Sequence, residues 1–104
     1  MPIAFKDKGA LATSTSGTLV PALPAGTVSG DYLVAEISHG ATGVLPTPAG
    51  WNLGFSYQIG TTHRMHFFWK FAGAGESNPS FTGGATTNGM WGVISSYSGV
   101  PIRA

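Results

Sequence analysis

A chain of 104 residues with only 9% charged side chains and a net charge of +1 is long enough for one domain around one hydrophobic core. The five cations are scattered, which excludes a basic stripe for nucleic acid, and the lack of cysteine excludes disulfides and thiolate metal sites. No apolar run approaches the ~20 residues of a membrane span, and the first residues do not resemble a secretory signal. We therefore expect a single domain over residues 1–104, with no nucleic-acid partner and no membrane insertion.

The N-terminal part of the chain is small and polar and leads into two turns. Residues 1–18 are expected to form an extended N-terminal arm, within which residues 12–17 are either an exposed strand or a loop. Two turns rich in proline and glycine follow, at 23–26 and 29–31. Residues 32–38 are apolar on both faces of a strand, which predicts a central, fully buried strand. Residues 40–50 contain two prolines and three glycines and predict a long loop.

Two stretches that alternate apolar and polar residues predict a β-hairpin over residues 51–71. Strict alternation places their apolar residues on one face, and we expect this aromatic face to be the floor of a sandwich core. The residues predicted for it are Trp51, Leu53, Phe55, Tyr57, Ile59, Met65, Phe67, Trp69 and Phe71. The opposite face carries Asn52, Ser56, Gln58, Arg64, His66, Phe68 and Lys70, and we expect it to meet water or a partner.

The rest of the chain continues the strand and turn pattern. Residues 72–79 predict a turn, Phe81 begins a short strand, 83–89 form a flexible tip, and 90–97 form a final strand. No segment shows a helical period. The sequence therefore predicts an all-β fold, an antiparallel β-sandwich of jelly-roll or immunoglobulin-like type with no substantial helix.

No constellation of catalytic, cofactor-binding or metal-binding residues emerges. His63 and His66 are three apart and point to opposite faces of a strand, so they do not chelate one ion. The four carboxylates include no pair that flanks a common site, and no serine lies in a nucleophile elbow. The glycine-rich segments do not precede helices, as a phosphate loop requires. We expect a protein that is not an enzyme and uses no cofactor or metal.

One surface is a candidate interface. Phe68 lies on the polar hairpin face among Arg64, His66 and Lys70, and an apolar ring among cations is typical of an interface. The alternative is that a second sheet or the N-terminal segment covers this face. Aromatic residues near loops could instead stack on sugar rings, and these are Trp51, Tyr57, Trp91 and Tyr97.

Four segments carry a resemblance to a known group of domains. They are Pro24 to Ala35, Thr47 to Trp51, Phe68 to Gly73 and Trp91 to Val100. In these segments the chain resembles β-sandwich domains of tailed-bacteriophage and prophage virion proteins, of the minor tail, fibre or head-decoration type. The likeness covers about residues 20–100 and consists of turn and packing signals, so no functional residue carries over. Domains of this group continue past the Ser-Gly-Val segment with further strands, which predicts that the sandwich here is completed by a symmetry mate or by the capsid lattice.

The resemblance implies a structural role in a phage particle. The expected protein is a surface-exposed head-decoration, tail or fibre component, located in the virion after assembly in the host cytoplasm and release by lysis. Its expected partners are copies of itself, with a trimer favoured, and other virion proteins. The alternative is a carbohydrate-binding module for host attachment, with residues 40–50 and 83–89 as contact loops. A secreted structural or adhesive protein of a bacterial surface is a third alternative.

Overall fold

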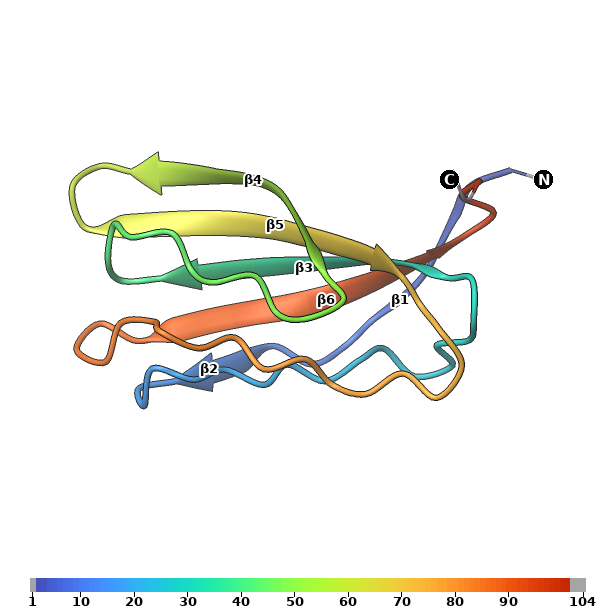
Figure 1. The fold of residues 1–104 in the computed structure, drawn as a ribbon, viewed down its shortest axis with the longest axis horizontal. Helices are drawn as coiled ribbons and strands as arrows, with labels where there is room; N and C mark the ends of the chain where they lie inside the picture. Colours follow the sequence, from blue (N-terminus) through green and yellow to red (C-terminus); the bar gives the residue numbers. More distant parts are fainter. Residues whose placement is uncertain (1, 102–104) are drawn as a thin grey trace.

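The computed structural model of the protein describes residues 2–101, which form one antiparallel sheet of six strands and no helix. The strands are β1 (Ala4–Lys8), β2 (Ala12–Ser14), β3 (Tyr32–His39), β4 (Asn52–Ile59), β5 (His63–Phe71) and β6 (Met90–Ser98). In Figure 1, β4, β5, β3 and β6 lie side by side in that order, and β1 and β2 follow beyond β6. The predicted all-β class is confirmed. No helix long and apolar enough to cross a membrane occurs within residues 2–101.

Strand β3 is the centre of the sheet, as its apolar sequence predicts. It pairs with β5 on one side and with β6 on the other over its whole length. Leu33, Ala35 and Ile37 are completely buried, and this side of the sheet is called the inner face below. Tyr32 and Val34 point to the other side, the outer face, and are only half-buried. The prediction of a strand buried on both faces is therefore wrong for the outer face.

The N-terminal residues are part of the sheet rather than an arm. Strands β1 and β2 both pair with β6, at opposite ends of it, with Phe5 facing Tyr97 and Thr13 facing Trp91. Between the two strands, the Gly9 amide donates a hydrogen bond of 2.8 Å to the Ile94 carbonyl, so the edge is nearly continuous. Residues 4–14 thus supply one border of the sheet.

A layer of loops, not a second sheet, covers the inner face within residues 2–101. The segments 15–31 and 72–89 run alongside each other. They form a β-bridge in which the amides of Leu19 and Phe81 each donate to the other's carbonyl at 2.8 Å, and further backbone hydrogen bonds join them at both ends. The short strand predicted at Phe81 is reduced to this bridge. The core between loops and sheet consists of Leu19, Leu33, Ala35, Ile37, Leu45, Trp51, Phe68, Ala72, Phe81, Met90 and Ile94.

The predicted hairpin forms from β4 and β5, but a bulge at Gly54 divides β4 into two halves that face opposite ways. Leu53 pairs with Phe68, whereas the next paired residue, Phe55, faces Phe67. Because one residue is inserted, Trp51 and Leu53 belong to the inner face and Phe55, Tyr57 and Ile59 to the outer face. Glycine suits this position because a Cβ there would lie 3.0 Å from the Phe67 carbonyl oxygen.

The faces of β5 and of the second half of β4 are the reverse of the prediction, whereas Trp51 is buried in the core as predicted. Phe68 and His66 are completely buried on the inner face, whereas Phe55 and Tyr57 are 56% and 62% exposed. The inner face is the one that the loops cover, so His66 and Phe68, which are predicted to meet water or a partner, lie in the core, while Asn52 and Gln58 stay exposed. The expectation that the aromatic face forms the floor of the core is therefore wrong from Phe55 to Phe71 and correct for Trp51.

Candidate functional site

The outer face of the sheet is the most unusual surface of the molecule, because it is rich in aromatic side chains and none of them is fully buried. The strand registers bring to it residues from all six strands. Its apolar members are Phe5, Tyr32, Val34, Phe55, Tyr57, Ile59, Met65, Phe67, Trp69, Phe71, Trp91, Val93 and Tyr97. Exposed apolar surface of this extent marks an interaction site.

The aromatic rings of the outer face contact one another across the strands. The Tyr32 ring lies 5.2 Å from the ring of Phe71, 5.9 Å from that of Trp69 and 6.5 Å from that of Tyr97, between centroids. Phe55 stacks on Phe67 at 4.6 Å. Such pairs fix the rings in place before any partner arrives, so less side-chain entropy is lost on binding.

The relief of the outer face is uneven. Two hollows of about 350 Å³ and 360 Å³ adjoin Tyr32 and Val34, one towards Phe55 and Trp69 and the other towards Tyr97. Rings of Tyr32, Phe67 and Trp69 line the first hollow together with the smaller Val34 side chain. The face therefore offers both cavities that can receive a side chain and side chains that can fill a cavity.

The charges on the outer face are few and of both signs. Lys8 faces Ser95 at the β1 border, and Glu36 lies in the centre between Val93 and Phe67. Neither side chain forms a salt bridge within residues 2–101. The face is thus apolar with one cation and one anion available for pairing.

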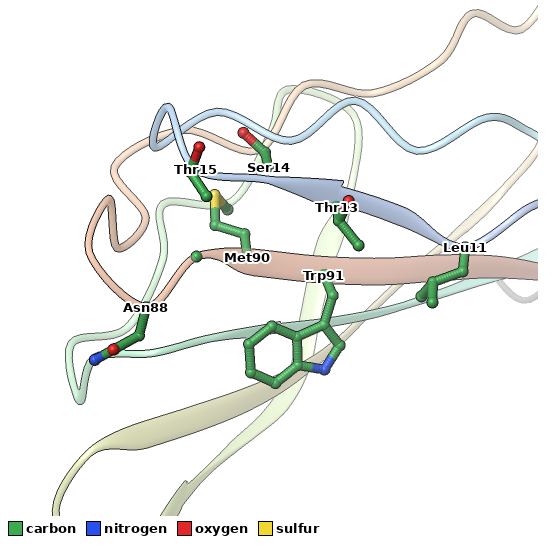
Figure 2. A pocket seen from close by; sticks show the side chains of 8 residues that line it. Leu11, Thr13, Ser14, Thr15, Asn88, Met90 and Trp91 are labelled. Carbon is green, nitrogen blue, oxygen red and sulfur yellow. The ribbon is translucent and has the colours of Figure 1, made fainter.

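A separate depression of about 500 Å³ lies at one corner of the sheet, where β2 meets the start of β6 (Figure 2). Its lining includes Trp91, which is 37% exposed, and Thr13, Thr15 and Asn88, whose polar groups point away from the Trp91 ring in Figure 2. Asn88 comes from the 83–89 loop, one of the two loops predicted to contact sugars. The other, 40–50, leads into Trp51, whose ring is buried against Phe81.

The four residues predicted as an interface, Arg64, His66, Phe68 and Lys70, lie together on the inner face and hold the loop layer. The Arg64 guanidinium donates to the Thr42 carbonyl at 2.6 Å and to the Ser56 hydroxyl at 2.9 Å. The Lys70 ammonium donates to Glu76 at 2.6 Å. This corrects the expectation of an exposed polar face. The alternative of a covered face is the observed one, with loops as the cover.

His66 is joined by a second buried histidine, His39, with the two rings 5.6 Å apart. His66 accepts a hydrogen bond from the Leu45 amide and donates one to the Ile37 carbonyl. His39 donates to the Gly43 carbonyl and accepts from the Ala85 amide. Each ring therefore uses one nitrogen as donor and one as acceptor, which is the neutral form. Burial lowers the pKa of His66, and the neighbouring His39 and Arg64 lower it further, against the opposing bond to Ile37.

The remaining carboxylates have structural partners. Burial raises the pKa of Asp31, but the hydrogen bond and charge of Lys6 and the amide of Val28 outweigh it, so the pKa lies below its ordinary value. The pKa of Glu76 is lowered in the same way by Lys70 and the Gly73 amide. His63 and His66 point to opposite faces, as predicted, and no group of three metal-ligating residues occurs within residues 2–101.

No family model, curated protein or solved structure matches this chain. The sequence grouped the hairpin aromatics of the outer face correctly but assigned them to the core, because both faces of the hairpin contain rings. The position of Phe68 between His66 and Lys70 was a sign of the true orientation. An aromatic residue among polar residues is also expected on a core face whose polar side chains bind the backbone of covering loops.

Proposed function

We propose that this protein is a non-enzymatic structural component of a bacteriophage particle, exposed as a head-decoration, tail or fibre protein, and that its outer face is the surface through which it assembles. One observation carries the proposal. The inner face of the sheet is packed into a core, whereas none of the aromatic side chains on the outer face is fully buried. A free monomer would keep this face in water at a large cost in hydrophobic free energy.

The chemistry of the polar residues supports an assembly role over catalysis. The buried ionisable groups serve the fold, because Asp31 and Glu76 bind lysines and loop amides and His39 and His66 bind loop backbone. The resemblance of residues 20–100 to virion β-sandwich domains supplies the particle as the place of assembly. The low charge suits a protein that spends its functional life in a large assembly.

Antibodies raised against the purified protein test the proposal directly. We expect them to label intact phage particles purified from the source of the sequence, and mass spectrometry of those particles to recover peptides of this chain. Particles free of the protein, with the chain found only in the soluble lysate, would overturn the virion role.

The corner depression favours a second candidate function, the carbohydrate-binding host-attachment module. A tryptophan that is 37% exposed and lines a depression is a side chain on which a sugar ring can stack. A glycan array separates the two functions. If the protein binds a glycan and Trp91→Ala abolishes the binding while Tyr57→Ala does not, the attachment function holds. If no glycan is retained, it fails.

A further inference from the structure

The inner face shows what an irregular cover requires, and the outer face lacks it. Loops carry backbone amides and carbonyls that need partners when buried. On the inner face, Arg64, His66 and His39 supply these partners to the loops 40–50 and 82–89. On the outer face, apolar side chains outnumber polar ones by thirteen to seven, and within residues 2–101 the hairpin rings have no polar neighbours comparable to Arg64, His66 and His39, so a cover must satisfy most of its own backbone. A β-sheet does so through its strand pairing.

We propose that the outer face of a second copy of this chain is that cover, so that two sheets pack face to face into a symmetric β-sandwich. This inference rests on the proposed function and specifies its first assembly step. A contact between identical faces has a two-fold axis, so the unit is a dimer and not the trimer expected from the sequence. Two packed sheets lie about 10 Å apart with interdigitated side chains, which the relief of this face allows.

The face is complementary to itself in shape. Protruding rings, such as those of Phe55 and Tyr57, lie on the same face as the two hollows beside Tyr32 and Val34. In a two-fold contact, each copy offers rings to the hollows of the other. A face of uniform height would have no such means of excluding water.

The face is also complementary to itself in charge. Lys8 and Glu36 have no ionic partner within residues 2–101 and carry opposite signs. A reciprocal contact can place the cation of each copy near the anion of the other. A partner of different sequence would need to supply both charges, whereas the second copy already has them.

The outer face is large enough to form a specific interface with a second copy. The four long strands contain eight or nine residues each, and β1 and β2 extend the sheet by one further strand width. With strands 4.8 Å apart and 3.3 Å per residue, one face covers on the order of 600 Å² before side-chain relief is counted. Two faces together bury on the order of 1,200 Å², the lower bound for a specific protein interface.

Light scattering over a range of protein concentrations tests the inference, with two matched variants. The natural chain should form a dimer, and Val34→Lys, in the centre of the outer face, should raise its dissociation constant about 100-fold because a lysine is buried without a partner. Val44→Lys is the control, since Val44 is 53% exposed in the 40–50 loop on the other side of the molecule. Circular dichroism verifies that both variants fold, and Tyr57→Lys replaces Val34→Lys if that variant does not.

A charge swap identifies the partner as a second copy. We expect Glu36→Lys alone or Lys8→Glu alone to weaken the dimer about tenfold through like-charge contacts, and the double variant Lys8→Glu/Glu36→Lys to restore it. Restoration would not follow if the cover were a different protein, whose charges do not change.

Three results would overturn the inference. They are a monomer at all concentrations, a dimer that Val34→Lys leaves intact, and a double variant as weak as the single ones. Each is distinct from a failure of the proposed function, which is decided by whether particles contain the protein. A monomer that is nevertheless found in particles would assign the outer face to another virion protein.

Discussion

The two faces of this sheet differ in how they are buried, and the difference does not follow their hydrophobicity. The inner face includes two histidines, an arginine and a lysine, yet it forms the core. The outer face holds most of the aromatic rings, yet none is fully buried. The kind of layer that covers a face decides which side chains that face needs. Loops need hydrogen-bonding partners from the sheet, whereas a second sheet does not. Polar side chains within an apolar face can therefore indicate a core covered by loops.

The largest expected difference in unfolding free energy is between two alanine variants, one of an inner-face aromatic and one of an outer-face aromatic. Phe68→Ala should lower the free energy of unfolding by about 3–5 kcal/mol, because Phe68 is completely buried and its ring lies 5.0 Å from that of Phe81. Phe55→Ala should cost about 1 kcal/mol, mainly through its stacking on Phe67. Urea denaturation at concentrations below dimer formation measures both. Equal losses would mean that the faces do not differ in packing.

A smaller contrast lies within β6, where the faces alternate. A Cβ at Gly92 would lie 2.5 Å from the Cδ1 atom of Ile37 and 2.9 Å from the Glu36 carbonyl oxygen, so Gly92→Ala should cost about 1–3 kcal/mol. In a thermal melt this lowers Tm by roughly 5 to 20 °C. The control is Ser95→Ala on the outer face, which we expect to leave Tm nearly unchanged. A tolerated Gly92→Ala would contradict the close packing of the inner face.

The inner face should also make stability depend on pH. His66 has a folded-state pKa below its ordinary value of 6.5, so the unfolded chain takes up a proton first as the pH falls. Stability is full above about pH 7 and declines below pH 6.5 by up to about 1.4 kcal/mol per pH unit. His66→Gln should remove this part of the slope, whereas His63→Gln, on the outer face, should keep it. An identical slope in both variants would refute the role of His66.

The smallest effect is expected where the β1 edge meets the turn before β3. Lys6→Met leaves the buried Asp31 with only the Val28 amide and should cost about 1 kcal/mol at pH 7. Because the folded-state pKa of Asp31 is lowered, this loss should vanish as the pH falls through that value. Lys8→Met, on the outer face, should leave the unfolding free energy of the monomer unchanged. Denaturant titration at pH 7 and pH 3 measures both variants.

Much of the secondary structure could be predicted from the sequence, because the strands at 32–38, 51–71 and 90–97 have clear patterns. The orientation of the hairpin could not, since Gly54 inserts one residue and turns half of β4 over. A glycine inside an alternating run is the local sign of such a bulge. The pairing of residues 4–14 with β6 also escaped prediction, because partners 76 to 94 positions apart leave no local pattern.

The sheet topology has a consequence for how the chain folds during synthesis. Strand β6 pairs with β1, β2 and β3, and it is the last of the six strands within residues 2–101 to be made. Before it appears, only β3, β4 and β5 can pair, and β1 and β2 have no partner. Sheets built from such distant pairings form slowly, and their unfinished edges are prone to aggregate. We expect a nascent chain stalled before Met90 to be a strong chaperone client.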